Sequence, residues 1–428
     1  MSAASPPPAQ RLRIFSWTLF DFANTAFSVI IVTVIYSRYF THHVAGGQHW
    51  LWGLAVSLSM ICAAILSPPL GAAADHSNHK KLFLFLFTIV SVTCTGLLFF
   101  VQEGMIAAGM ALFILANIGF EGGLVFYDAF LPSLTSPKSY GRISGYGFAM
   151  GYLGALVVLL IVNVLLPESS HQNYFFFVRM SFVIAAGFFF LFSLPMFFVV
   201  PEPITFSAIR KAGYIREGIG QAATTFRAIF IDKKYPSIRR FLIAFFIYND
   251  GILTVIAFAA IFAENILHMD DKAIIIFFAI VQTSAMLGSV VFGYITDIIG
   301  PKKTISITLL LWIGISIGAY FVSTVTVFYI VACAAGIAIG SSQSASRTMM
   351  ALLTPKDQEA ELFGFYDGLC GKASAVVGPF VYGITADITN ERVAALTIGA
   401  FFVIGLFVLL GVREQDRSNA QPGHVSFQ

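Results

Sequence analysis

The chain has 428 residues, of which 57% are hydrophobic and 11% are charged, and its mean hydropathy is +0.83. A soluble domain carries about 25% charged residues, so this composition argues against a soluble fold and indicates a chain embedded in lipid. The net charge of +3 gives no reason to expect a nucleic-acid partner, and the four cysteines lie inside apolar runs, without metal-ligand or disulfide spacing.

The N-terminal residues 1–13 are polar and rich in proline, which predicts a disordered tail. An apolar run then extends from Ile14 to about Phe40 and contains Asp21 and Asn24. A signal peptide would have a short apolar region followed by a small-residue cleavage site. We therefore interpret this run as a retained first membrane span.

Eleven further apolar runs follow, each long enough to cross about 30 Å of hydrocarbon. In lipid, the backbone finds hydrogen-bond partners only within itself, so every span is expected to be helical. The sequence thus predicts an all-α membrane protein with 12 transmembrane helices. The spans lie near residues 14–40, 51–74, 82–101, 105–130, 142–166, 174–200, 239–263, 272–296, 304–323, 326–352, 361–386 and 393–413.

The distribution of lysine and arginine predicts the orientation. With both termini on one side, 19 of the 25 Lys and Arg residues fall on that side, and only Lys272 and Arg392 fall in the opposite loops. Cytoplasmic loops carry the excess of positive charge. We therefore expect both termini, including the tail 414–428, in the cytoplasm, and a bacterial inner (plasma) membrane as the location.

Residues 201–238 form the one long polar segment between spans, near the middle of the chain. Ile215, Ile219, Phe226 and Phe230 recur within it at helical spacing among charged residues. This pattern predicts an amphipathic helix that lies on the cytoplasmic leaflet.

The two halves of the chain resemble each other. GAAADHSNHKK at residues 71–81 follows the second span, and GYITDIIGPKK at 293–303 follows the eighth; LTSPK at 134–138 is echoed by LTPK at 353–356. Two motifs that recur in order at a nearly constant offset indicate an internal repeat. We expect two pseudo-symmetric six-helix bundles, 14–200 and 239–413, joined by the cytoplasmic segment 201–238.

These loop motifs, with G-x-x-x-D before basic residues, resemble those of the major facilitator superfamily, although the first copy has Ser77-Asn78-His79 where Gly and a basic residue are usual. More narrowly, WTLFDFANTAF (17–27), FYDAFLPSL (126–134), SGYGFAMGYLG (144–154) and YNDG (248–251) resemble the vacuole-effluxer branch, which includes a yeast autophagy-related vacuolar amino-acid permease. The resemblance implies the major facilitator fold and, by analogy with the yeast member, efflux of amino acids.

Polar side chains inside the predicted spans are candidates for the substrate site. A charge at the bilayer centre costs about 2.5–3.5 kcal/mol on insertion scales, so such residues usually face a cavity and have a function. In the superfamily that the chain resembles, spans one, four, seven and ten line this cavity. The candidate substrate-binding residues are Asp21, Asn24, Glu121, Tyr127, Asn249, Asp250, Gln343, Arg347 and Lys372.

We expect Asp21 and Asn24 from the first half to converge with Asn249, Asp250 and Lys372 from the second half. Charges of both signs in one cavity would suit a zwitterion. Its ammonium would face a carboxylate, and its carboxylate would face Lys372.

The carboxylates in the spans outnumber the cations, and a carboxylate without a cation in low dielectric tends to hold a proton. Asp21 and Glu121 are the candidates for proton coupling, because no cation lies near the middle of the first six spans. The alternative is that these carboxylates have structural partners. Asp128 and Asp367, which lie closer to the cytoplasmic boundary, favour that structural interpretation.

Asp75 and Asp297, in the repeated loop motif, are expected to act as latches of a cytoplasmic gate. Nucleotide-binding loops and catalytic motifs are missing from the sequence, so we expect no enzyme activity, cofactor or metal. The function that fits best is a monomeric secondary active transporter of a small polar solute, working by alternating access in the lipid bilayer, with protons as a candidate coupling ion. A carrier of lipid-like or amphipathic molecules, suggested by the 45 phenylalanines, and a non-transporting membrane sensor with the same fold remain as alternatives.

Overall fold

The computed structural model describes residues 7–167, 171–202, 214–269 and 271–413. The first span is one helical run from Pro8 to Val44, in which α1 (Pro8–Phe27), α2 (Tyr36–Arg38) and two π-helical stretches, η1 (Ser28–Val34) and η2 (Tyr39–Val44), follow one another. The other long helices of the first half are α3 (His49–Ser77), α4 (Lys80–Leu97), α5 (Ile106–Ala129), α7 (Tyr140–Leu165) and α8 (Tyr174–Val199). Short segments between them are η3 (Leu98–Phe100), α6 (Leu131–Leu134) and η4 (Pro137–Ser139).

The second half repeats this pattern after a linker helix. The linker holds α9 (Tyr214–Phe226) and the π-helical η5 (Arg227–Ile231). The long helices that follow are α10 (Pro236–Leu267), α11 (Asp271–Ile299), α12 (Pro301–Phe321), α13 (Val325–Leu353) and α16 (Glu391–Leu410). The span between α13 and α16 consists of α14 (Glu359–Phe363), the π-helical η6 (Gly364–Gly371) and α15 (Val377–Ile388).

Eleven helical stretches of 20 to 37 residues, within the described parts of the chain, are long and apolar enough to cross a membrane. The pair η6–α15 supplies the twelfth crossing in two pieces. Large apolar side chains such as Phe198, 82% exposed, and Ile298, 79% exposed, point away from the protein, as expected where lipid covers the outer surface. The protein is therefore an integral, multi-pass membrane protein with 12 membrane crossings.

Local sequence explains several helix starts. Proline stands at or next to the first position of α1, α10 and α12, where its missing N–H is not needed. The side chains of Thr324 and Asn390 accept the N–H groups of Val327 and Val393 at the starts of α13 and α16.

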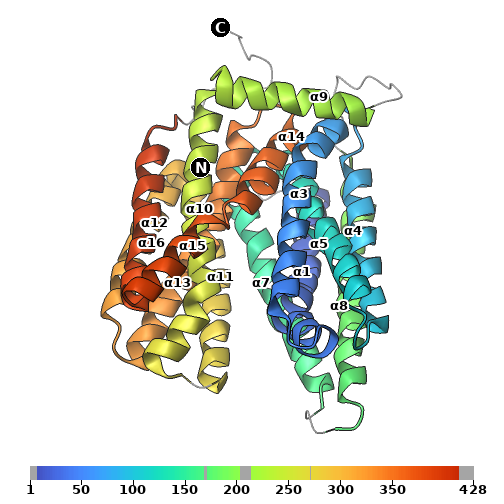
Figure 1. Ribbon diagram of the computed structural model, residues 1–428. Coiled ribbons are helices and arrows are strands. Elements are labelled where there is room, and N and C mark those ends of the chain that lie inside the picture. The colour runs from blue at the N-terminus through green and yellow to red at the C-terminus, as the bar shows by residue number, and fades with distance from the viewer. Residues whose placement is uncertain (1–6, 168–170, 203–213, 270, 414–428) are drawn as a thin grey trace.

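The helices form two bundles, with the first half on one side and the second half on the other, and α9 lies across one end of both (Figure 1). In the first bundle α1 packs against α7 and α8, and α4 packs against α5; in the second, α16 packs against α10, α12 and α15. Between the bundles, α7 packs against α11 and α13, and α3 packs against α14 and η6.

Contacts between the bundles are closest toward the α9 end. A Cβ on Gly71 would collide with the Ala360 carbonyl, and one on Gly141 would lie 2.6 Å from the Gly293 carbonyl oxygen. Away from this end, Figure 1 shows α7 and the second bundle diverging from each other. The bundles are thus joined at the α9 end.

Two expectations need correction. The tail 1–13 is predicted to be disordered, but α1 begins at Pro8, and the Gln10 side-chain amide donates to the Leu134 carbonyl at 3.0 Å; residues 1–6 and 414–428 lie outside the described residues. For the span 361–386 the sequence predicts one helix with a kink at Gly378-Pro379, but turn residues 374–376 break it earlier and separate η6 from α15. Hydropathy does not detect this break, because its residues are small and apolar or weakly polar.

Candidate functional site

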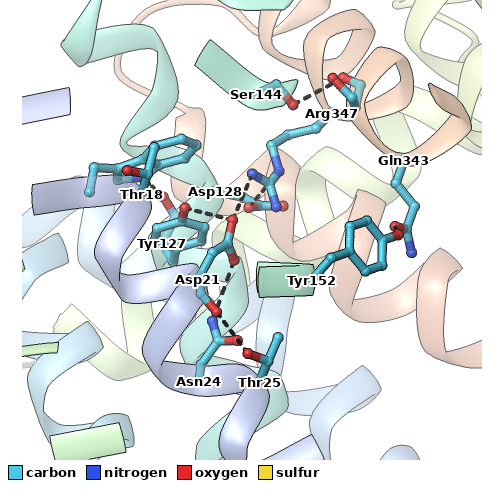
Figure 2. Close-up of polar contacts among 12 residues, drawn as sticks. Thr18, Asp21, Asn24, Thr25, Tyr127, Asp128, Ser144, Tyr152, Gln343 and Arg347 are labelled. Carbon is cyan, nitrogen blue, oxygen red and sulfur yellow. Dashed lines mark hydrogen bonds and ion pairs between the residues drawn. The ribbon is translucent and has the colours of Figure 1, made fainter. Parts of the chain in front are cut away.

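Arg347 of α13 joins three helices at the interface between the bundles. Its Nε lies 2.9 Å from Oδ1 of Asp128 at the end of α5, and its Nη1 lies 3.4 Å from Oδ2 of Asp21 on α1. Figure 2 shows the guanidinium between the two carboxylates. The side chain is only 3% exposed. Burial of three charges is tolerated because they neutralise one another in part, and the Arg347 Nη1 group also donates a hydrogen bond to Asp21.

Aromatic rings and neutral polar groups hold this cluster in place. The Tyr127 hydroxyl donates to Oδ2 of Asp21 at 2.8 Å, and the Asn24 amide lies 3.5 Å from Oδ1 of the same carboxylate. The Tyr127 ring stacks on Trp17 with centroids 4.5 Å apart. The Arg347 guanidinium lies 3.8 Å from the centre of the Phe148 ring, a cation–π contact that favours arginine over lysine.

Lys372, directly after η6, forms the second ion cluster. Its Nζ contacts Oε2 of Glu121 on α5 and lies 3.4 Å from Oδ2 of Asp367 on η6. Lys372 and Glu121 are 12% and 9% exposed at their side chains. This cluster again ties a helix of the first bundle to a cation of the second.

The two clusters lie about two turns apart along α5, which carries both Glu121 and Asp128, and together we call them the network. Four carboxylates face two cations, so the fully ionised network carries two more negative than positive charges. The expectation that Asp21 and Glu121 lack a cation is wrong. Their cations come from the other half of the chain, 326 residues from Asp21 in the case of Arg347.

Gln343 also lies at the interface between the bundles, one turn of α13 before Arg347. The Tyr152 hydroxyl of α7 donates to its Oε1 at 2.5 Å (Figure 2). The Ser144 hydroxyl of α7 donates to the Ser344 carbonyl of α13 at 3.0 Å. Tyr152 and Trp17 are not among the predicted site residues, although both lie in sequence motifs that resemble the vacuole-effluxer branch.

Asn249 and Asp250 have partners within their own bundle. Asn249 donates to the Ser374 hydroxyl at 2.7 Å, and both carboxylate oxygens of Asp250 accept the Gly378 N–H, at 2.8 and 2.9 Å. Asp250 is 1% exposed. The sequence predicts substrate contact for these two residues, but the structure gives each of them a partner at the break before α15.

Asp75 and Asp297 occupy equivalent places at the α9 end. Asp75 accepts the N–H groups of Ala360 and Glu361 at 3.2 and 2.9 Å, at the start of α14, and its carboxylate also lies 2.9 Å from Lys80. Lys80 in turn lies 2.7 Å from Glu359. The contacts of Asp75 with α14 and of Lys80 with Glu359 join the first bundle to the second. The ion pair between Lys80 and Asp75 lies within the first bundle and holds these two side chains together.

Asp297 makes the reciprocal contact from the second bundle. It accepts the N–H groups of Gly141 and Arg142 at 2.8 and 3.4 Å, at the start of α7, and its carboxylate lies 3.4 Å from the Arg142 side chain. A carboxylate at a helix N-terminus is favoured by the unpaired N–H groups and the helix dipole. The repeated motif therefore closes the α9 end twice, once from each half.

Comparison with known proteins agrees with this architecture. The sequence profile of the family described as "Vacuole effluxer Atg22 like" matches residues 52–421. The MFS-type transporter YxiO of Bacillus subtilis (strain 168) is 28% identical over 94% of this chain and 95% of its own length. Autophagy-related protein 22-1 of Neosartorya fischeri is 24% identical over 84% of this chain and 74% of its own.

Solved structures with the same fold include the human organic anion transporter MFSD10 (TETRAN), with a TM-score of 0.74 and 14% identity, covering 94% of this chain and 100% of that one. The major facilitator transporter FucP in its outward conformation has a TM-score of 0.73 and 13% identity, covering 95% and 99%. This likeness concerns the fold alone. The chain belongs to the vacuole effluxer Atg22-like family and is a membrane transporter of the major facilitator superfamily.

Proposed function

We propose that the protein is a proton-coupled secondary transporter that exports amino acids by alternating access. The observation that carries this proposal is the buried network of Asp21, Asp128, Arg347, Glu121 and Lys372, completed by Asp367, in which both cations belong to one bundle. Three of the four carboxylates belong to the first bundle, whereas both cations belong to the second. Ion pairs across a bundle interface must break or exchange partners when the bundles rock against each other.

The contacts at the α9 end support a state that is closed there and open toward the opposite side. Both gate aspartates hold helix starts of the other bundle, and the close glycine contacts between α7 and α11 lie toward the same end. The bias of lysine and arginine supports a cytoplasmic location for that end. The proposed state is therefore outward-facing, in a bacterial inner membrane, with cytoplasmic termini.

The charge of the network supports an amine-containing substrate and a proton. The excess of two negative charges is balanced by a proton, a substrate ammonium, or both. When Glu121 takes a proton, Lys372 becomes available to the carboxylate of a zwitterion, whose ammonium then has Asp367 within the same cluster. An amino acid carries a carboxylate and an ammonium on the same carbon, and the family's description as effluxers supports the outward direction.

Purified protein in proteoliposomes provides the test. Vesicles loaded with one unlabelled amino acid should exchange it for the same labelled amino acid outside, whereas sugars and dicarboxylates should not exchange. A screen of the common amino acids without exchange by the folded, monomeric protein would reject amino acids as the substrate class. Exchange of amphipathic molecules instead would favour the lipid-like alternative.

A further inference from the structure

We propose that Asn249 and Asp250 are positioning residues. They fix the break between η6 and α15 and thereby hold Lys372 against Glu121. This inference rests on the proposed role of Lys372 as the group that receives the substrate carboxylate. It assigns the neighbouring Asn249 and Asp250 to the protein's own backbone instead of to the substrate.

The break leaves unpaired backbone groups at both of its edges. η6 ends at Gly371, residues 374–376 form a turn, and α15 begins at Val377. Helix ends expose carbonyl groups on one side and N–H groups on the other. Inside a membrane, water does not satisfy these groups unless they line a cavity, so side chains must do so.

Adjacent residues of α10 meet these needs, one at each edge. At the first edge, Asn249 contacts the Gly371 carbonyl at 3.5 Å and donates to the Ser374 hydroxyl at 2.7 Å, which in turn donates to the same carbonyl at 2.9 Å. At the second edge, Asp250 accepts the Gly378 N–H with both oxygens. A Cβ on Gly378 would collide with the Thr254 hydroxyl, so α15 lies directly against α10 here.

Lys372 lies within the first edge, one residue after Gly371 and two before Ser374, and it precedes Gly378 at the second edge by six residues. A shift of the break would therefore move the base of its side chain relative to Glu121 on α5. Asp250 itself makes no ion pair among the described residues. Its effect on transport is then expected to depend on Lys372.

The test compares Asp250→Asn with Asp250→Leu. Asparagine keeps an oxygen that accepts the Gly378 N–H, whereas leucine has a similar size and no acceptor. We expect Asp250→Asn to retain amino-acid exchange within about threefold of wild type and Asp250→Leu to lose about tenfold or more, because a buried donor is left unpaired. In a Lys372→Ala background, Asp250→Leu should cause little further loss.

A second measurement does not depend on the substrate. Cys370, in η6 close to the break, is buried, and the other three cysteines can be replaced by serine. A small water-soluble thiol reagent should modify Cys370 slowly in wild type and Asp250→Asn, and about tenfold faster in Asp250→Leu. If wild type exchanges no amino acid while Cys370 reacts as described, the proposed substrate class is wrong. The proposed role of Asn249 and Asp250 in holding the break is then still supported.

Two outcomes would overturn the proposal that Asn249 and Asp250 hold the break in place. Equal loss of exchange in both Asp250 variants, with Cys370 still protected, would mean that the carboxylate itself carries a proton or binds substrate. Effects of Asp250→Leu and Lys372→Ala that simply multiply would mean that Asp250 does not act through Lys372.

A separate observation concerns the linker helix, and from it we infer that α9 is a strap that holds the α9 end closed. By sequence α9 belongs with the second bundle, because η5 and residues 232–235 connect it directly to α10. By packing it belongs with the first bundle, because it lies along α3. Figure 1 shows it crossing the end of the molecule over both bundles.

The contact with α3 is close and specific. A Cβ on Gly218 would lie 2.5 Å from the Pro69 carbonyl oxygen and 2.9 Å from the Ala73 nitrogen. Ala222, one turn later, is buried, and the Phe226 ring contacts Phe365 of η6, with centroids 6.4 Å apart. The same helix thus touches α3 and η6, which must separate for this end to open.

Two glycines of α9 allow a matched test. Gly218→Leu would push α9 off α3, whereas Gly220→Leu, in the same helix, meets nothing within 4 Å. Spin labels at the exposed residues Val164 of α7 and Ile276 of α11, at the far end, report the distance between the bundles. We expect Gly218→Leu to move the distance distribution toward shorter values, because closure there accompanies opening at the α9 end, and Gly220→Leu to leave it as in wild type.

If Gly218→Leu does not fold, Gly218→Ala introduces the same close contact with a single methyl group. Identical distributions for a folded Gly218 variant and Gly220→Leu would overturn the strap. This measurement needs no substrate, so it does not depend on the identity of the transported molecule.

Discussion

At the scale of residues, the Arg347 guanidinium makes contacts with several groups at once that the ammonium of a lysine could not make. Arg347 reaches Asp128 with Nε and Asp21 with Nη1 while its planar face lies on the Phe148 ring. A lysine at this position would place one compact charge on a flexible chain and would satisfy these partners incompletely. A buried carboxylate left without its cation is destabilised more than an exposed one.

Arg347→Lys is therefore expected to reduce amino-acid exchange by about tenfold or more, although the formal charge is unchanged. The matched control is Arg38→Lys, the same substitution at an exposed position of the first span, which should stay close to wild type. Exchange rates in proteoliposomes at equal protein content provide the measurement. If the Arg347→Lys protein were as active as the control, simultaneous contact of the guanidinium with Asp21 and Asp128 would be unimportant for exchange.

At the scale of elements, the sequence is a good guide to where helices lie and a poor guide to where they are interrupted. Long apolar runs in the sequence predict the eleven continuous crossings, because lipid requires long apolar helices. The break before α15 escapes this pattern, because it arises from partners on α10 that are about 125 residues away in sequence. Because these partners are so far away in sequence, the sequence shows no structural role for Asn249 and Asp250, and it predicts substrate contact for them instead.

The linker helix was also only partly predictable. Its spacing of Ile219, Phe226 and Phe230 predicts an amphipathic helix, which α9 and η5 form. Ile219 is 56% exposed, however, while Gly218 lies against α3 and Ala222 is buried. The apolar spacing thus combines an outward position, Ile219, with Phe226 and Phe230, which contact η6 and the core, and the glycine that lies against α3 carries no hydrophobic signal.

At the scale of the whole molecule, the internal repeat makes the two halves hold each other reciprocally. Asp75 of the first half holds the start of α14, and Asp297 of the second holds the start of α7. Because the loop motif is repeated, the sequence predicts both aspartates as latches. Among the described residues, the ion pairs Asp21–Arg347 and Glu121–Lys372 have no counterpart related by the repeat, so the sequence does not predict their pairing.

In the proposed transport cycle, protonation of Glu121 releases Lys372 for the substrate and so links transport to the proton gradient. Glu121→Gln resembles the protonated carboxyl and removes the titratable group. Substrate exchange without a gradient should therefore persist in this variant, while accumulation driven by a gradient should be lost.

The most direct measurement compares wild type and Glu121→Gln in the same proteoliposomes, with labelled amino acid and an imposed pH gradient. The account predicts that wild type accumulates the amino acid only when the gradient is present, and that Glu121→Gln exchanges it but does not accumulate it. Wild-type transport that is indifferent to the gradient, or gradient-driven accumulation by Glu121→Gln equal to wild type, would contradict the account.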